Sequence, residues 1–349
     1  MNHFPDLLAN IGEEVLDVEE EAFLLFAQDV PSNNLGMIDP RAPSVEISIN
    51  DKEYTIHQSP SLLSSHRAGG TTGAGAYMKI CVICSLASRI SPKHGLPPRK
   101  LYFRIATCYS SASANVCPFI FLWKITPLFA EWITSPKNPF WTYDILNHSS
   151  IVTELGTGIS ALVALTLAPA VHHYIATDQE YVQKLFRTNL DANSSTSTSP
   201  ATSTSKKSKS KGSKAKPKPA PVTNISFTTL DWETDQAGLL KEECMDSVDE
   251  DKGFDLILSC DCIYNEALVA PFVRTCAEIC RLRPTYPEGT DSRKPTVCII
   301  AQQQRSPDVF ETWLRETMRD FRVWRLSDEV LGEGLRSGSG YLVHLLLVK

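Results

Sequence analysis

The sequence predicts an α/β fold built on a doubly wound, mostly parallel sheet of seven strands, with an antiparallel strand at one edge. Three observations predict it. From residue 122 onward, short apolar runs alternate with segments of helical periodicity, which is typical of βα units. The apolar runs are nearly continuous, as in strands that are covered on both faces. The last two runs are separated only by a glycine-rich stretch, so we expect them to pair antiparallel.

Residues 1–75 predict an N-terminal extension made of one helix and one β-hairpin. Over residues 13–29, apolar side chains recur at the spacing of a helix face. Residues 45–50 and 53–58 alternate in polarity around a two-residue turn, which is the pattern of a short hairpin.

The remaining elements follow from the same two kinds of pattern and form the main domain over residues 122–349. Helices are expected where apolar residues recur every three to four positions, over residues 122–134, 159–167, 181–192, 266–281 and 308–319. Strands are expected where an apolar run is bounded by polar or turn residues, over residues 151–155, 173–177, 225–229, 254–259, 296–301, 321–326 and 341–348.

Two segments differ from the rest in composition. Residues 193–221 hold seven lysines, no acidic residue and no apolar residue larger than alanine or proline, which predicts a disordered linker rich in Ser, Thr, Lys and Pro. Its lysines suggest weak contact with RNA or the ribosome, with a solvated spacer as the alternative. Residues 76–121 hold six basic residues, no acidic residue and four cysteines, which indicates an insertion foreign to the fold or a read-through segment. Cys81 and Cys84 form a C-x-x-C pair, but no second pair follows, so we expect no metal site.

The charge of the chain is unevenly distributed. The 349 residues carry 34 basic and 40 acidic side chains, a net charge of −6. Without the two basic segments, the remaining 274 residues carry 21 basic and 40 acidic side chains, a net charge of −19. An acidic body attracts basic partners and repels bare nucleic acid, although the same charge also serves solubility.

The composition also excludes several classes of protein. No apolar run is long enough for a membrane span, and the first residues lack the basic and apolar regions of a signal peptide. Ten cysteines without a secretory signal are expected to be reduced thiols. We therefore expect a protein of the cytoplasm or the nucleus, and exclude a disulfide scaffold, a membrane protein and a collagen-like chain.

The residues after the first two strands of the main domain are typical of a cofactor site. Residues 154–158 read E-L-G-T-G and lead into a helix, so that two glycines allow a ligand close to the backbone at a helix N-terminus. The next strand leads into Asp178, whose carboxylate suits a ribose diol. This pattern fits NAD and S-adenosylmethionine equally well, but Ala161 stands where the NAD fingerprint has its third glycine.

Two further segments favour S-adenosylmethionine. Residues 230–232 read L-D-W after the third strand, and the indole of Trp232 can close an adenine pocket. After the fourth strand, Asp261 and Tyr264 stand three positions apart, at the sheet edge where open α/β proteins bind their ligands.

These four motifs, in this order, resemble the seven-stranded, S-adenosylmethionine-dependent protein-lysine methyltransferases related to methyltransferase-like protein 21. The resemblance covers residues 45–75, 122–192 and 222–349 and is greatest to a fungal branch. It implies a Rossmann-like fold, S-adenosyl-L-methionine as cofactor and methylation of a lysine in a basic protein, large-subunit ribosomal protein L1 in that branch. The alternative is a cofactor-binding, ribosome-associated interaction protein with little catalysis.

The resemblance also assigns roles to residues. It implies that the cofactor is lined by Trp123, Gly156, Thr157, Gly158, Asp178, Trp232 and Cys260. Glu154 is expected to reach the ammonium group of the cofactor, with capping of the next helix as its alternative. Asp261 and Tyr264 are the expected catalytic pair, with Asp261 as the N-cap of the following helix as the alternative. For Trp123 and Trp232, the alternative to a cofactor contact is packing in the core. Residues 302–305 are expected either to flank the substrate channel or to form a surface turn.

Overall fold

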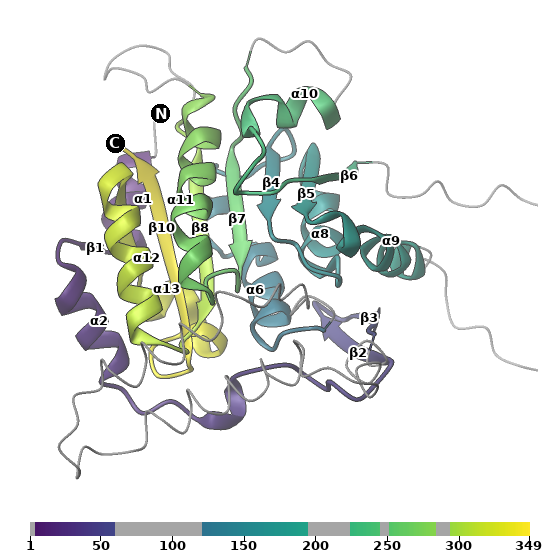
Figure 1. The fold of residues 1–349 in the computed structure, drawn as a ribbon, viewed down its shortest axis with the longest axis horizontal. Coiled ribbons are helices and arrows are strands. Elements are labelled where there is room, and N and C mark those ends of the chain that lie inside the picture. The colour runs from purple at the N-terminus through teal and green to yellow at the C-terminus, as the bar shows by residue number, and fades with distance from the viewer. Residues whose placement is uncertain (1–3, 60–120, 195–223, 245–250, 284–293) are drawn as a thin grey trace, which may run out of the picture.

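The computed structural model describes residues 4–59, 121–194, 224–244, 251–283 and 294–349 (Figure 1). Most of the expected insertion over 76–121, including Cys81 and Cys84, lies outside the described residues, as does nearly all of the expected linker over 193–221. In the part of the chain that is described, no helix combines the length and the apolar character needed to cross a membrane.

An eight-stranded sheet forms the centre of the molecule, in the order β1-β9-β10-β8-β7-β4-β5-β6 (Figure 1). The five strands β4, β5, β6, β7 and β8 pair with one another in parallel. Strand β10 is antiparallel to both of its neighbours, β8 and β9. The strands are β1 (Gly12–Val15), β4 (Ile151–Leu155), β5 (His173–Asp178), β6 (Ile225–Thr229), β7 (Leu256–Cys260), β8 (Val297–Gln303), β9 (Phe321–Leu326) and β10 (Tyr341–Val348). The predicted fold class is confirmed, with one strand more than the seven expected.

The extra strand is β1, where the sequence predicts the beginning of a helix. In place of one helix over residues 13–29, the structure has α1 (Phe4–Ile11), β1 and α2 (Val18–Phe26). Strand β1 pairs antiparallel with β9. Glu14 forms an ion pair with Arg322 of β9 at 2.7 Å, and Glu13 forms one with Arg325. These cross-strand charges favour the strand, and the partners lie more than 300 residues away in the sequence.

A second correction concerns the connection between the last two strands. The sequence predicts no helix there, but α13 (Asp328–Leu335) occupies most of the connection. Its backbone leaves the helical conformation at Gly332, where φ is +67°, so that the glycine interrupts the helix without preventing its first turn. The expected antiparallel pairing of the two strands is confirmed, with Leu345 opposite Trp324.

Helices cover both faces of the sheet, and Figure 1 shows α11 and α12 in front of it. One face packs against α1, α6 (Ile125–Thr134), α7 (Pro139–Thr142), α8 (Leu162–Leu167), α9 (Glu180–Ser194) and α13. The other face packs against α2, α10 (Leu240–Cys244), α11 (Glu266–Arg281) and α12 (Pro307–Asp320). Three short 3₁₀ turns complete the described elements: η1 (Ser32–Asn34), η4 (Ala168–Ala170) and η5 (Ala237–Leu239).

The predicted hairpin is confirmed and is anchored to the main domain by two asparagines. Strands β2 (Ser44–Ile49) and β3 (Lys52–His57) form a separate two-stranded sheet. Asn189 of α9 accepts a hydrogen bond from the His57 amide at 2.7 Å and donates one to its carbonyl. Asn193 does the same for Thr55, at 2.8 and 2.9 Å. The two buried side chains therefore satisfy backbone groups at the open edge of β3.

The segment between α2 and the hairpin runs along the carboxyl edge of the main sheet. Residues 36–38 lie beside residues 122–124, with backbone hydrogen bonds of 3.0 Å from Ile38 to Leu122 and from Lys124 to Gly36. The Gln58 side chain also accepts a bond from the Leu122 amide. These contacts hold the residue between them, Trp123, against the extension.

Candidate cofactor and acceptor site

The candidate site lies at the carboxyl edge of the five parallel strands, where the strand order reverses between β4 and β7. Ligands of open α/β sheets bind at such a reversal because the loops on either side diverge and leave a crevice. The glycine turn follows β4, Asp178 ends β5, Trp232 follows β6, and Asp261 and Tyr264 follow β7. The topology therefore brings the four predicted motifs to one edge.

The turn after β4 depends on its two glycines for different reasons. Gly156 has φ +69°, and a Cβ there would lie 2.3 Å from Cys262 Sγ and 3.3 Å from the Trp232 ring. Gly158 has φ +64°, but a Cβ there would meet no atom within 4 Å. The protein therefore fills the space at Gly156 and leaves open space at Gly158. The next residue with left-handed backbone is Ala161, so α8 starts at Leu162 and not at the expected residue 159.

Asp178 joins the end of β5 to this turn. Its Oδ2 accepts a hydrogen bond from the Gly158 amide at 2.8 Å, and its Oδ1 accepts one from the Gln179 amide at 2.7 Å. Burial raises the pKa of Asp178 to about 6, against the effect of these two backbone donors. A carboxylate oxygen has a second acceptor position, so both oxygens can still receive a hydroxyl donor.

Glu154 is fully enclosed beneath the turn. One of its oxygens accepts hydrogen bonds from Thr157 Oγ1 at 2.6 Å and from the Tyr174 hydroxyl at 2.8 Å. Burial raises the pKa of Glu154 to about 7, partly offset by these two donors. Thr157 thus contacts Glu154 directly, and the expected role of both residues toward a cofactor stays a prediction.

Trp232 forms a wall on the other side of Gly156. Its ring lies 5.0 Å from that of Phe272, edge to face, and its carbonyl accepts a bond from Arg274 at 2.7 Å. Its Nε1 is buried and has no hydrogen-bond partner. Part of the ring therefore packs in the core, as the alternative proposed, and the buried Nε1 is left as a donor without an acceptor in this structure. Sequence reasoning missed Cys262, which lies behind this wall with Sγ 3.3 Å from the Leu155 carbonyl.

Asp261 is the centre of a buried charged cluster. Its backbone has φ +65° and its side chain is 1% exposed. The carboxylate accepts bonds from both terminal nitrogens of Arg305, one at 2.7 Å, and from the amide and side chain of Gln303 at 3.1 and 2.9 Å. The helix-cap alternative is wrong, because Asn265 caps α11 by accepting a bond from the Ala267 amide.

Arg305 connects this cluster to Trp123. Its guanidinium lies 4.7 Å from the centre of the Trp123 ring while it binds Asp261. Gln303 in turn accepts a bond from the Gly36 amide at 2.5 Å. We name this group (Gly36, Trp123, Asp261, Gln303 and Arg305) the Arg305 cluster. The surface-turn alternative for residues 302–305 is therefore wrong, because Gln302, Gln303 and Gln304 are buried and Arg305 binds Asp261.

Cys260 lies between the Arg305 cluster and the glycine turn. Burial, with the nearby charges of Asp261 and Glu154, raises the pKa of its thiol well above the usual range, so it remains protonated at neutral pH. Its Sγ is 4.0 Å from Thr126 Oγ1. The side chain is partly exposed at the edge of β7, which agrees with a position that lines a ligand.

Tyr264 lines a small hollow that Asp261 does not line. Ile263, Phe26 and Arg305 line it as well, and Gln303 also borders it. Arg305 and Gln303 thus bind Asp261 and also border the hollow that Tyr264 lines. Whether the pair acts in catalysis stays a prediction.

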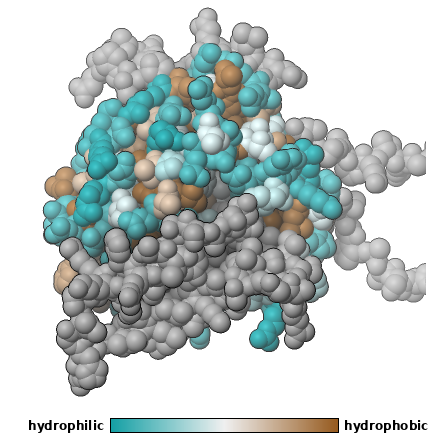
Figure 2. All heavy atoms as spheres, viewed as in Figure 1, coloured by the Kyte–Doolittle hydropathy of each residue, from teal (hydrophilic) through white to brown (hydrophobic). Residues whose placement is uncertain are grey.

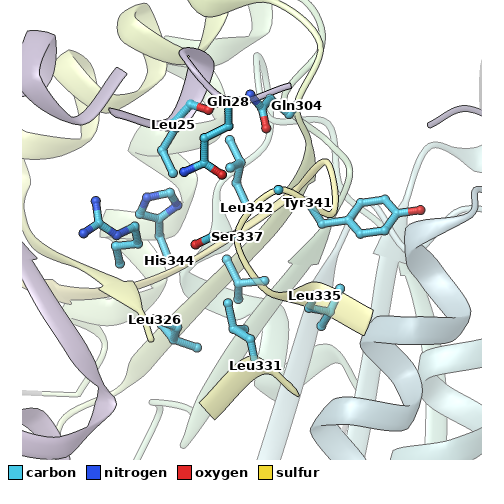
Figure 3. Close-up of a pocket in the computed structure, with 13 residues that line it drawn as sticks. Leu25, Gln28, Gln304, Leu326, Leu331, Leu335, Ser337, Tyr341, Leu342 and His344 are labelled. Atoms are coloured by element: carbon cyan, nitrogen blue, oxygen red, sulfur yellow. Dashed lines mark hydrogen bonds between the residues drawn. The ribbon is translucent and has the colours of Figure 1, made fainter. Parts of the chain in front are cut away.

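A second hollow lies away from the predicted cofactor and catalytic residues, and Gln304 of the predicted channel segment borders it. Figure 3 shows its lining, in which leucines of α13 and β10 face His344 and Leu25 while the Tyr341 ring extends away from the group. His344 is buried and approaches Glu21 of α2 at 3.1 Å, and Glu21 also pairs with Arg325 at 2.6 Å. This hollow lies at the contact of α2 with the sheet.

Among the described residues, no three His, Cys, Asp or Glu side chains form a group able to hold a metal.

Comparison with curated proteins finds distant relatives. Ribosomal lysine N-methyltransferase 5 of Zygosaccharomyces rouxii is 26% identical over 242 residues, which span 66% of this chain and 74% of that protein. The protein of the same name from Lachancea thermotolerans is 28% identical over 192 residues, or 50% of this chain and 48% of that protein. The chain is thus distantly homologous to these fungal methyltransferases, which confirms the resemblance.

One relative has a different name. Diaminohydroxyphosphoribosylamino-pyrimidine deaminase of Schizosaccharomyces pombe is 23% identical over 308 residues, or 88% of this chain. The chain spans about half the length of that protein, 52%. No protein-family model matches the chain.

Solved structures are similar only at a low level. The O-methyltransferase TomG from Streptomyces achromogenes, in complex with SAM, has a TM-score of 0.34 at 11% identity, covering 58% of this chain and 74% of that one. The S-adenosylmethionine-dependent methyltransferase SibL has a TM-score of 0.37 at 13% identity, covering 83% of this chain and 66% of that one. The strand order and pairing described above give the chain its Rossmann-like methyltransferase fold.

Proposed function

We propose that the protein is an S-adenosylmethionine-dependent protein-lysine N-methyltransferase that acts on a ribosomal protein, large-subunit protein L1 by resemblance. One observation carries the proposal. The glycine turn, Asp178, Trp232 and Asp261 converge at the strand-order reversal of the sheet, in a chain homologous to ribosomal lysine methyltransferases.

The residues around the glycine turn fit the cofactor. The open space at Gly158 allows a ligand to approach the backbone, and both oxygens of Asp178 retain an acceptor position for the ribose hydroxyls. The unsatisfied Nε1 of Trp232 supplies a donor toward the adenine side. The pKa of Glu154 is about 7, so its carboxyl group is only partly ionised at neutral pH. The ammonium group of the cofactor would favour the ionised form, which suits Glu154 as its partner.

The cofactor, when bound, supplies a methyl group on a positively charged sulfur. The chain must then present a neutral lysine amine, which costs about 4.6 kcal/mol at pH 7 for an amine of ordinary pKa. Burial of the amine lowers its pKa, and alignment in a dry channel supplies most of the remaining effect. Cys260 stays a neutral thiol and adds no negative charge there.

Asp261 is better suited to positioning than to proton removal. Its carboxylate already accepts two bonds from Arg305 and two from Gln303, so a lysine would have to compete with a guanidinium for it. We assign to Asp261 the task of holding Arg305 and Gln303, and through them Trp123 and the segment around Gly36. Tyr264 and the hollow that it lines are then the entrance for the acceptor side chain.

The experiment is a transfer assay with the full chain, methyl-labelled S-adenosylmethionine and purified L1, with modified residues located by mass spectrometry. The proposal expects label on lysine. Binding of cofactor and ribosomes without transfer would favour the alternative of a ribosome-associated protein with little catalysis. Absence of cofactor binding in calorimetry would overturn both.

A further inference from the structure

Helix α2 exposes large apolar side chains that have no place in the core. Phe23 is 77% exposed and Leu24 is 41% exposed, and Leu16, just before the helix, is 81% exposed. Across the described ranges, the other large apolar side chains of comparable exposure are Tyr181 and Leu239, each on a different element. Figure 2 shows a face on which hydrophilic side chains predominate and hydrophobic ones form small groups. Three exposed apolar side chains within nine consecutive residues are the kind of feature that interaction surfaces show.

The same part of the helix is acidic. Glu19 and Glu20 lie in its first turn, and its last turn has no basic residue. Glu13 and Glu21 both pair with Arg325, whereas Glu19 and Glu20 form no ion pair with any described residue. We name Leu16, Glu19, Glu20, Phe23 and Leu24 the α2 surface.

The α2 surface leads to the entrance of the proposed acceptor site. Phe26, three positions after Phe23 and so its neighbour on the helix surface, packs its ring against Phe310 of α12 at 5.5 Å between ring centres. The Leu25 carbonyl accepts a bond from Gln304 at 2.8 Å. Phe26 itself lines the hollow that contains Tyr264 and Arg305. One helical turn, about 5 Å, therefore separates the exposed Phe23 from a residue of that hollow.

We infer that the α2 surface docks a basic, amphipathic segment of the acceptor protein next to the target lysine. This inference rests on the proposed function, because the acceptor enters through the same hollow. Carboxylates that form no ion pair within the described residues, beside exposed apolar side chains, suit a segment that carries both Lys or Arg and apolar residues. The same carboxylates repel nucleic acid, anionic membranes and the α2 surface of a second copy.

The test compares matched surface variants of the full chain. Phe23→Ser with Leu24→Ser removes the apolar part, and Glu19→Lys with Glu20→Lys reverses the charge. Leu239→Ser is the control, because Leu239 is 54% exposed but lies on η5. All these side chains are exposed, so circular dichroism should show unchanged folding.

The measurements are the affinity for purified L1 by calorimetry and the kinetics of methyl transfer. We expect both double variants to bind L1 at least tenfold more weakly and to raise KM at unchanged kcat and cofactor affinity. The effect of the charge reversal should shrink at high salt. Leu239→Ser should stay within twofold of wild type.

The outcomes separate the two proposals. Methylation of L1 with equal KM in wild type and both double variants would overturn the docking inference and leave the proposed function intact. Binding of L1 that the α2 variants lose, without methylation by wild type, would support docking and overturn the proposed function. If wild type neither binds nor methylates L1, both are wrong.

Discussion

Replacing Arg305 by alanine tests whether the Arg305 cluster holds the candidate site together. The substitution removes both charged donors of Asp261, whose side chain is 1% exposed, and leaves only the two neutral bonds from Gln303. Removing one partner of a buried ion pair costs about 3–5 kcal/mol, because the remaining charge is left without compensation. Loss of the contact with the Trp123 ring adds about 0.5–1 kcal/mol. We therefore expect the free energy of unfolding to fall by about 3.5–6 kcal/mol in total.

The assay is urea denaturation of the single and double variants. Arg305→Ala combined with Asp261→Asn leaves no unpaired charge, so the double variant should be more stable than Arg305→Ala alone. Arg315→Ala is the control, because its pair with Glu311 on α12 is 3.9 Å long and exposed, and it should cost less than about 1 kcal/mol. If Arg305→Ala destabilises no more than Arg315→Ala, the cluster does not support the site as argued.

Three further predictions concern single buried side chains. Asp178→Ala should weaken S-adenosylmethionine binding by roughly ten- to a hundredfold, the loss of a charge-assisted contact, and equal affinity in calorimetry would remove Asp178 from the site. The pKa of Glu154, raised to about 7 in the folded chain, means that its ionisation destabilises the fold increasingly from about pH 4.5 to pH 7. Glu154→Gln should therefore be more stable than wild type at pH 8, by up to about 3 kcal/mol, and the difference should vanish near pH 4; equal melting at pH 8 would contradict this. Gln58→Ala loses three hydrogen bonds, to Leu122, Asp39 and Ala42, and should lower the free energy of unfolding by about 2–4 kcal/mol, whereas Gln28→Ala, which loses one exposed bond of 3.4 Å, should change it little.

The sequence by itself determined the elements that depend on near neighbours in the chain. The strands over 151–155, 225–229, 321–326 and 341–348 have the predicted bounds, because short runs rich in apolar, β-branched and aromatic residues between turn residues favour a strand through local pattern alone. The gathering of the glycine turn, Asp178, Trp232 and Asp261 was also predictable, since parallel strands bring their carboxyl ends to one edge.

Only the tertiary structure decided the features that depend on distant partners. Residues 12–15 form a strand because β9 offers a backbone edge and two arginines to Glu13 and Glu14. Asp261 is held by Arg305, 44 residues further on, and not by the helix that follows it. In both cases a charged side chain is stabilised by an opposite charge that the fold brings alongside, and the free energy of such a pair depends on distance and burial, which local sequence does not encode.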